Sequence, residues 1–278
     1  MSATAVSREL KTIGVVGAGR MGTPIIGHLV RKGFTTQVCD LNAARAGSVK
    51  ELGAEWAADP KSLAAACDAI LVCVGFDREV QDLLAEGGPL RRARRGTVIA
   101  ILSTIHPKTV RSLARDCEGA GLHVVDSTVC RGGEAADKGT LLSFVGGSAE
   151  VVHRLTPALR AYSSDVVHTG GVGTAQIAKA VNNLILWACL VADHEGLALA
   201  QHYGADIEAL RRALLISSCA NGPLEKWGSQ TMAWAEDDMA IVAEMAAEAG
   251  IALPQAGVNR EICRALKPRR YKLDLYGR

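Results

Sequence analysis

The chain has 278 residues, of which 49% are hydrophobic, and a formal net charge of +2. A chain of this length is expected to fold as two packed units rather than around one core. The near-neutral charge argues against nucleic acid as the main partner. The one dense basic run, residues 91–95, is interpreted as a solvated helix end.

The cysteines and the first residues indicate the cellular compartment of the protein. Eight cysteines are present and none forms a CxxC pair, so the sequence predicts neither a redox motif nor a metal site. Residues 1–10 lack the apolar segment of a signal peptide. The longest apolar run outside the expected sheet, 184–192, is shorter than the roughly 20 residues of a membrane span. We therefore expect a reduced, cytoplasmic protein that does not contact a membrane.

The first half of the chain alternates strand-like and helix-like segments. The expected strands are rich in Val and Ile, as strands buried on both faces of a parallel sheet are. They cover residues 12–16, 37–40, 69–74, 97–101, 122–126, 141–146 and 165–168. Helical patterns cover residues 21–32, 43–52, 61–67, 77–84, 108–119 and 149–161. This alternation predicts an α/β fold with a parallel-type Rossmann sheet over residues 1–170.

The second half, residues 171–278, is predicted to be an all-helical domain. Glycines at 170, 171 and 173 form a flexible break, after which residues 174–202 form one long connecting helix. Further helices are expected at 207–217, 235–249 and 255–266, followed by a basic, extended tail at 267–278. Long apolar helices with few aromatic residues pack readily against a copy of themselves, so we expect a homodimer or homotetramer.

A GxGxxG pattern lies between the first expected strand and the first helix. Gly17 permits a tight turn, Gly19 lets the backbone approach a pyrophosphate, and Gly22 allows the helix to pack closely on the strand. The helix N-terminus offers free N–H groups and a partial positive charge to the phosphates. The alternative is a structural turn without a cofactor. The predicted dinucleotide-binding loop consists of Gly17, Ala18, Gly19, Arg20, Met21 and Gly22.

Asp40 ends the second expected strand. An acidic side chain at this place accepts hydrogen bonds from the adenosine ribose hydroxyls and repels a 2′-phosphate. Asp40 therefore favours NAD as the cofactor, with NADP less favoured. Alternatively, Asp40 caps the helix that begins near Asn42, and the two roles are compatible.

Lys179 lies within the first two turns of the long helix, and Asn183 follows four residues later on the same face. The helix dipole opposes a positive charge at this end, which favours release of the lysine proton in a reaction. The alternative is an ordinary exposed lysine whose stem lies along the helix.

Together these segments resemble the β-hydroxyacid dehydrogenase family over nearly the whole chain. The order and spacing of five segments agree with that family: the glycine loop, Ser103–Pro107, Asp126–Leu141, Lys179–Asn183 and Glu195–Ala200. The resemblance implies a Rossmann domain joined by a long helix to a helical domain, with the active site in the cleft. It also implies that Lys179 is the general acid/base and that Asn183 orients the substrate. Val74, Ser103 and Thr104 are then assigned to the cofactor, and Thr104 also to the substrate.

The substrate segment departs from the family at two positions. The family pattern D-A-P-V-S-G-G is replaced by D-S-T-V-C-R-G at 126–132, so Cys130 and Arg131 stand for a serine and a glycine. The planar guanidinium of an arginine suits carboxylate, sulfonate or phosphate, and the sulfolactaldehyde reductases also carry arginine at this place. We therefore assign Cys130, Arg131 and Gly132 to a small anionic substrate. Alternatively, Arg131 is a surface residue or pairs with Glu134. Cys130 is expected to line the pocket rather than to act as a nucleophile.

Asp237 stands where the family commonly has a lysine that reaches the active site, which puts the standard substrates in doubt. The sequence predicts an NAD-dependent oxidoreductase that interconverts a small anionic β-hydroxy compound and its aldehyde or ketone, with no metal ion. Two alternatives remain open. One is an imine reductase-like enzyme, against which Lys179 argues. The other is a non-catalytic dinucleotide-binding regulator, which Asp237 suggests.

Overall fold

The computed structural model describes residues 9–277 and divides the chain into two compact units, residues 1–179 and 180–278. The division falls within helix α8 (Thr174–His202), whereas the sequence predicted a boundary at residue 170, just before this helix. The sequence predicted no signal peptide in residues 1–10. Residues 1–8 of this segment lie outside the described residues.

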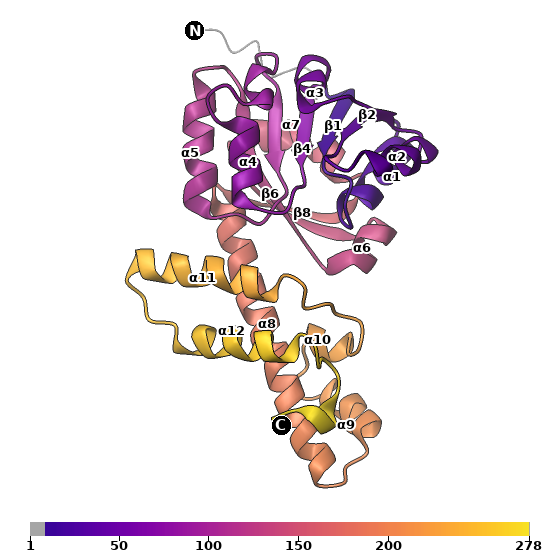
Figure 1. Cartoon of the computed structure of the whole chain (residues 1–278), viewed down its shortest axis with the longest axis vertical. Coiled ribbons are helices and arrows are strands. Elements are labelled where there is room, and N and C mark those ends of the chain that lie inside the picture. Colours follow the sequence, from indigo (N-terminus) through magenta and orange to yellow (C-terminus); the bar gives the residue numbers. More distant parts are fainter. Residues whose placement is uncertain (1–8, 278) are drawn as a thin grey trace. The chain divides into compact units, whose positions relative to one another are not determined.

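The first unit is built on an eight-stranded sheet with the order β3-β2-β1-β4-β5-β6-β7-β8 (Figure 1). All neighbouring strands are parallel except β6 and β7, which are antiparallel. The predicted α/β fold with a Rossmann-type sheet is confirmed. The strands are β1 (Thr12–Val16), β2 (Thr35–Cys39), β3 (Glu55–Trp56), β4 (Ala69–Val72), β5 (Val98–Ile101), β6 (His123–Cys130), β7 (Leu141–Gly146) and β8 (Ser163–Gly170).

Helices cover both faces of this sheet. Alternate side chains of a strand point to opposite faces, so Ile13 and Val15 of β1 join the core beneath α1 and α7, while Val16 joins the core beneath α3, α4 and α5. The α-helices are α1 (Gly22–Arg31), α2 (Ala46–Glu51), α3 (Pro60–Ala66), α4 (Asp77–Leu84), α5 (Pro107–Glu118), α6 (Gly132–Lys138) and α7 (Ala149–Leu159). Two 3-10 helices, η1 (Ala43–Arg45) and η2 (Pro89–Arg92), complete the unit as described.

The structure corrects the sequence prediction at several elements. Strand β3 and helix α6 were not predicted, and β6 and β8 are longer than expected. The basic run at 91–95 begins in η2 and is only partly solvated. Arg91 donates to the backbone oxygen of Asp116, and Arg94 pairs with Asp68 at 3.2 Å. The tail predicted to be extended instead forms turns and the 3-10 helix η3 (Leu273–Leu275).

The second unit contains helices and connecting loops but no strand among its described residues. It contains most of α8 together with α9 (Ile207–Leu214), α10 (Gly222–Glu225), α11 (Ala235–Ala249) and α12 (Pro254–Leu266). Helices α11 and α12 lie side by side (Figure 1). Trp187, Leu190 and Met239 belong to their common core with α8. By length and composition α8 is the one described helix that could cross a membrane, and the core helix of a soluble protein meets the same criterion.

His194 on α8 is buried in an uncharged arrangement within this unit. Its Nδ1 lies 2.7 Å from the Leu190 oxygen, and its Nε2 accepts a hydrogen bond from the Tyr271 N–H at 3.0 Å. The ring also packs on Trp227 and Tyr271, with centroids 4.6 and 5.3 Å away. A proton on Nε2 would remove the acceptor that Tyr271 requires.

We expect the protein to lose stability as the pH falls through the range in which His194 gains a proton. Burial lowers the pKa of His194 below its ordinary value of 6.5, so the unfolded chain takes up the proton first. This contribution to stability is complete above pH 6.5 and is lost as the pH falls toward the folded-state pKa. Urea unfolding at several pH values should show a smaller acid loss for His194→Gln than for the natural chain. Equal losses would contradict the prediction.

Candidate functional site

The glycine loop between β1 and α1 has the geometry that the sequence predicted. Gly17 has a positive φ of 102°, and a Cβ at this position would collide with the Cys73 oxygen. A Cβ at Gly22 would collide with the Gly17 oxygen, so the first turn of α1 packs directly on the loop. Side chains are therefore excluded from the places where the backbone bends most tightly. Such a bare loop at a helix N-terminus fits a pyrophosphate.

Asp40 holds this loop to the end of β2. Its Oδ2 accepts hydrogen bonds from the Ala18 N–H at 2.7 Å and from Arg45 Nη1 at 3.0 Å, and its Oδ1 accepts from the Asn42 N–H at 2.8 Å. The 12% exposed side chain thus joins the glycine loop to the turn before η1. Asn42, rather than Asp40, caps η1 through a bond from the Ala44 N–H.

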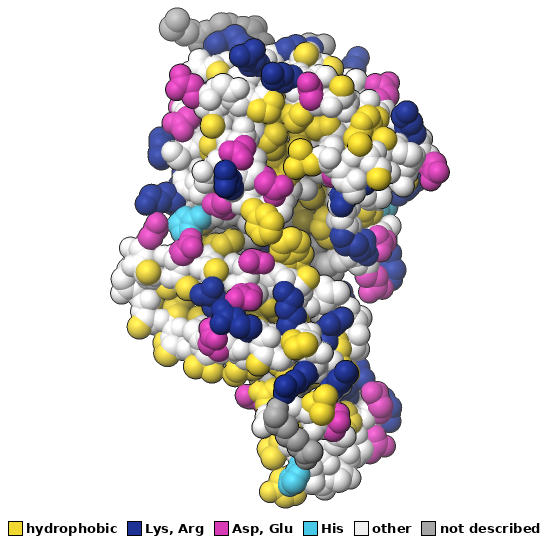
Figure 2. Space-filling view, in the orientation of Figure 1, with side chains coloured by type: hydrophobic (Ala, Val, Ile, Leu, Met, Phe, Trp, Pro, Cys, Tyr) yellow, Lys and Arg dark blue, Asp and Glu magenta, His cyan; other side chains and the backbone are white. Residues whose placement is uncertain are grey.

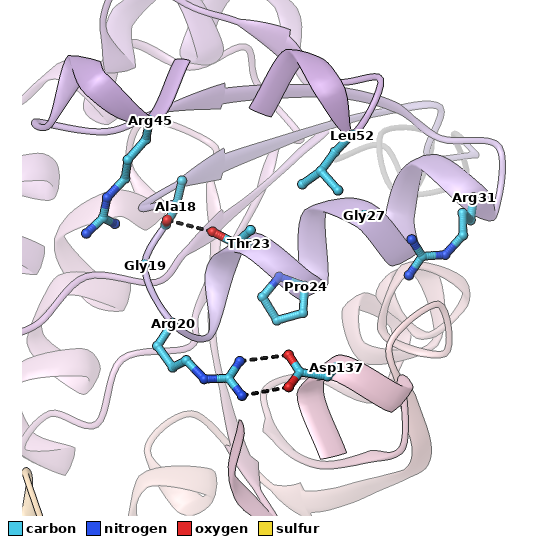
Figure 3. Close-up of a pocket in the computed structure, with 10 residues that line it drawn as sticks. All are labelled: Ala18, Gly19, Arg20, Thr23, Pro24, Gly27, Arg31, Arg45, Leu52 and Asp137. Atoms are coloured by element: carbon cyan, nitrogen blue, oxygen red, sulfur yellow. Dashed lines mark hydrogen bonds and ion pairs between the residues drawn. The ribbon is translucent and has the colours of Figure 1, made fainter. Parts of the chain in front are cut away.

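Arg20 of the glycine loop connects the loop to α6. Its guanidinium makes two hydrogen bonds of 2.7 Å to Asp137 (Figure 3). In the last turn of α1, His28 Nε2 lies 3.0 Å from the Ala136 oxygen and 3.1 Å from the Asp137 oxygen. A Cβ at Gly133 would lie 2.5 Å from the Arg20 guanidinium, so a side chain at this position would require the flexible arginine to shift. The segment after Arg131 is therefore packed on the helix of the glycine loop.

Ser103 and Val74 lie together at the carboxyl ends of β5 and β4. The Ser103 hydroxyl accepts from the Val74 N–H at 3.0 Å and donates to the Val74 oxygen at 2.9 Å. Gln176 of α8 holds the following turn, because its amide donates to the Ser103 oxygen at 2.8 Å and accepts from the Ile105 N–H at 3.0 Å. Thr104 between them is partly exposed. Three predicted residues thus lie at the sheet edge where ligands of open α/β sheets bind.

Asp126 of β6 fixes the first turn of α8. Its carboxylate is fully buried and accepts from the Gly173 N–H at 2.7 Å and from the Gln176 N–H at 2.9 Å. Thr128 adds a hydrogen bond of 3.0 Å to the Ala175 oxygen. Burial raises the pKa of Asp126, and the two N–H donors oppose that shift. A carboxylate from a strand therefore provides the cap for the helix N-terminus.

Lys179 lies one turn further along α8, with its amine directed to the end of β6. Lys179 Nζ donates to the Val129 oxygen at 2.8 Å and lies 4.0 Å from Cys130 Sγ. Cys130 is 5% exposed and Lys179 is half-buried. The amine is thus fixed beside the segment assigned to the substrate. Asn183, four residues further along α8, is buried and accepts a hydrogen bond from Asn182 at 2.9 Å.

Arg131 follows Cys130 and has a left-handed backbone, with φ of 83°. Arg131 Nη1 lies 2.7 Å from Asp165 Oδ2, 2.8 Å from Ser164 Oγ and 3.1 Å from the Thr140 oxygen. The ion pair therefore forms with Asp165 of β8 and not with Glu134, which pairs with Lys138 at 2.6 Å. Gly132 is exposed. An anion that binds the Arg131 guanidinium must share it with Asp165.

Comparison with known proteins identifies the family. A family model for the NAD binding domain of 6-phosphogluconate dehydrogenase matches residues 12–171. A second model, the NAD-binding domain of NADP-dependent 3-hydroxyisobutyrate dehydrogenase, matches residues 173–274. The chain belongs to the β-hydroxyacid dehydrogenase family. It is accordingly an NAD(P)-dependent oxidoreductase.

Individual relatives can be aligned with this β-hydroxyacid dehydrogenase over most of its length. It is 28% identical to 2-(hydroxymethyl)glutarate dehydrogenase of Eubacterium barkeri, covering 90% of this chain and 87% of the relative. It is 26% identical to 3-sulfolactaldehyde reductase of Escherichia coli, and the alignment covers 91% of this chain and 89% of the relative. The solved 3-hydroxyisobutyrate dehydrogenase of Mycobacterium tuberculosis has 22% identity, a TM-score of 0.83 and coverage of 94% and 95%. This last likeness supports the fold.

Three residues in this family member have structural roles that the sequence did not reveal. Asp237 lies in the first turn of α11 with Glu236 and Asp238. Acidic side chains at this end of a helix interact favourably with the positive end of its dipole. Asp137 and His28, which hold α6, were not predicted as part of the site, because α6 itself was not predicted. No group of three or more His, Cys, Asp or Glu side chains suited to a metal ion occurs within residues 9–277.

Proposed function

We propose that this β-hydroxyacid dehydrogenase uses NAD to interconvert a small anionic β-hydroxy compound and its aldehyde or ketone. The observation that carries the proposal is the Lys179 amine at the end of β6, hydrogen-bonded to Val129 at 2.8 Å. The glycine loop fits the pyrophosphate, because its backbone approaches closely at Gly17 and Gly22 and presents no side chain there. The nicotinamide supplies or accepts the hydride when bound.

Within this proposal, Lys179 moves the proton. In reduction its ammonium gives a proton to the substrate oxygen that becomes the hydroxyl, and in oxidation the neutral amine takes that proton back. The Val129 oxygen holds the amine in place, and Asp126 and Gln176 hold the helix that carries it. Preorganisation of the amine supports the rate, because little side-chain motion must be frozen when the substrate binds.

The substrate is proposed to carry a carboxylate or sulfonate, which Arg131 binds. The names of two relatives, 2-(hydroxymethyl)glutarate dehydrogenase and 3-sulfolactaldehyde reductase, are consistent with an acidic substrate. Only Nη1 of Arg131 has hydrogen bonds within the described residues, so the Nη2 and Nε edge remains for an anion. Thr104, Cys130, Gly132 and Asn183 are proposed as further substrate contacts.

We expect Arg131→Gly to raise KM for an anionic substrate about tenfold or more, since a hydrogen bond to a charged group contributes about 1.5–3 kcal/mol. Glycine adopts the left-handed backbone of this position without strain, so folding should be preserved. The matched variant is Asp165→Asn, which releases the guanidinium from its ion pair and should lower KM. Steady-state kinetics measure both. Unchanged KM in both variants would remove Arg131 from the substrate site.

The proposed preference for NAD rests on Asp40. Its carboxylate already accepts three hydrogen bonds, and its negative charge opposes a 2′-phosphate nearby. We expect Asp40→Ser to lower the ratio of kcat/KM with NAD to kcat/KM with NADP by about tenfold, the loss expected for about 1.4 kcal/mol. The ratio cancels any general weakening of the loop. A natural chain that prefers NADP would contradict the proposal.

The function is tested by assaying hydroxy acids and hydroxysulfonates with NAD at alkaline pH, following absorbance of the reduced nicotinamide. Turnover of an anionic β-hydroxy compound supports the proposal. Binding of the dinucleotide without turnover of any member of the set would instead indicate a non-catalytic regulator. Reduction of cyclic imines without reduction of aldehydes would indicate imine reductase-like chemistry.

We also propose that a second copy of the chain packs on an apolar stripe of α8 and on the residue that follows it. Val181, Ile185 and Leu199 share one face of α8 and are 49%, 57% and 61% exposed, and Tyr203, directly after the helix, is 82% exposed. A mass of 29.2 kDa by sedimentation would refute this assembly.

We further propose a cytoplasmic location with no nucleic acid or membrane partner. Consistent with this, acidic and basic side chains are interspersed over the face shown in Figure 2.

A further inference from the structure

Cys130 and Lys179 bring a thiol and an amine into contact in the first unit. Lys179 Nζ lies 4.0 Å from Cys130 Sγ while it donates to the Val129 oxygen. The lysine stem has four flexible carbons, so its nitrogen can approach the sulfur more closely without movement of the backbone. An ammonium beside a thiol also favours the thiolate, the form that reacts with oxidants.

The surrounding structure keeps this pair together. Cys130 ends β6 in register with Leu142 of β7, and its backbone therefore lies in the sheet. The first turn of α8 is fixed by Asp126 and by the bond from Thr128 to the Ala175 oxygen. The contact between sulfur and nitrogen thus joins two rigid elements, and it does not depend on a mobile loop.

The other cysteines do not share this environment. Burial raises the pKa of Cys39, Cys67 and Cys73 to about 12 and that of Cys263 to about 11, and it also raises the pKa of Cys117 and Cys189. These thiols are poor nucleophiles at neutral pH. Cys219 is exposed and lies beside Ser217. Among the eight cysteines, Cys130 is the one whose sulfur has a lysine amine at hydrogen-bond distance.

We propose that Cys130 is a site of reversible oxidation by hydrogen peroxide and that Lys179 captures the oxidised sulfur. In the first step the Cys130 sulfur attacks a peroxide oxygen, an S–O bond forms, the O–O bond breaks and water leaves. This step oxidises the sulfur by two electrons to a sulfenic acid. In the second step the neutral Lys179 amine attacks that sulfur, an S–N bond forms, and the S–O bond breaks as water leaves with one amine proton.

The product is a sulfenamide between the two side chains, and excess thiol reduces it to the original cysteine and lysine while the thiol becomes a disulfide. The proposal gives the replacement of serine by Cys130 a chemical consequence, because a serine cannot undergo this reaction. Because the S–N bond occupies the Lys179 amine, we expect oxidation to abolish turnover, and this expectation rests on the proposed function of Lys179. Formation of the S–N bond itself does not.

The test treats the full-length Cys219→Ser chain with hydrogen peroxide and measures its intact mass. We expect a loss of about 2 Da, the mass of two hydrogens lost in sulfenamide formation. Tryptic peptides should show Cys130 linked to Lys179, with no cleavage after Lys179, and dithiothreitol should restore the original mass. In Lys179→Arg, Cys130 should stay as a sulfenic acid and react with dimedone.

Two results would overturn the proposal. One is a dimedone adduct or a sulfinic acid at Cys130, without the cross-link, in a chain that retains Lys179. The other is a Cys130 that peroxide leaves unmodified under conditions that oxidise Cys219 in the natural chain. A reversible cross-link that leaves turnover unchanged would instead refute the proposed role of Lys179 and leave the modification site established.

Discussion

Replacing Lys179 with methionine is expected to lower kcat by a factor of about 10² to 10⁴, the range that general acid–base catalysis contributes. Methionine preserves most of the length of the stem beside Val129 and Cys130 but carries no proton to transfer. Binding of the dinucleotide should persist, because the glycine loop is formed by β1 and α1 and does not involve Lys179. Stopped-flow kinetics and titration of nicotinamide fluorescence measure the two quantities separately.

Two variants control this experiment. Lys179→Arg keeps a positive charge and a donor for the Val129 oxygen, but a guanidinium does not release its proton in proteins, so turnover should remain low. Lys50→Met on α2 removes an exposed lysine and should leave kcat unchanged. A Lys179→Met enzyme with natural turnover, or a Lys179→Arg enzyme restored to it, would exclude proton transfer by this residue.

The parts of the fold that the sequence predicted best are those determined by local chemistry. The first strand, the glycine loop and α1 follow from a buried Val- and Ile-rich run, from glycines at the two positions where a Cβ would collide, and from the helix that starts at Gly22. The placement of Lys179 near the start of a long helix was likewise predicted, because α8 has no helix-breaking residue over most of its length.

The parts that were missed depend on contacts between distant segments. The direction of β7 is not encoded in its hydrophobic pattern, since a buried strand has the same pattern in either direction. Helix α6 has only seven residues, too few for a helical period to be evident, and it is held by Arg20 of the glycine loop and by His28 of α1. The pairing of Arg131 with the neighbouring Glu134, considered as an alternative to substrate binding, is not formed, because the sheet brings Asp165 closer.

The same reasoning predicts that Asp126 determines both stability and the position of Lys179. Its two carboxylate oxygens each accept one N–H from the start of α8, and the group is fully buried. In Asp126→Asn, one oxygen becomes an NH2 group that faces an N–H donor, so one buried donor loses its partner. We expect the free energy of unfolding to fall by about 1–3 kcal/mol. Urea unfolding measures this loss.

Asp68, directly before β4, provides a matched control at the amino ends of the central parallel strands. One of its carboxylate oxygens accepts from the Lys11 and Thr12 N–H groups at 3.0 Å each, and the residue is 7% exposed. Asp68→Asn should therefore also reduce stability while leaving kcat unchanged. Asp126→Asn should reduce kcat as well, because the first turn of α8 determines the position of the next turn, which carries Lys179. The backbone amides of Gly173 and Gln176 should exchange hydrogen with solvent faster in Asp126→Asn than in Asp68→Asn. Equal kcat in the two variants at a temperature where both are folded would show that the cap supports the fold without positioning the amine.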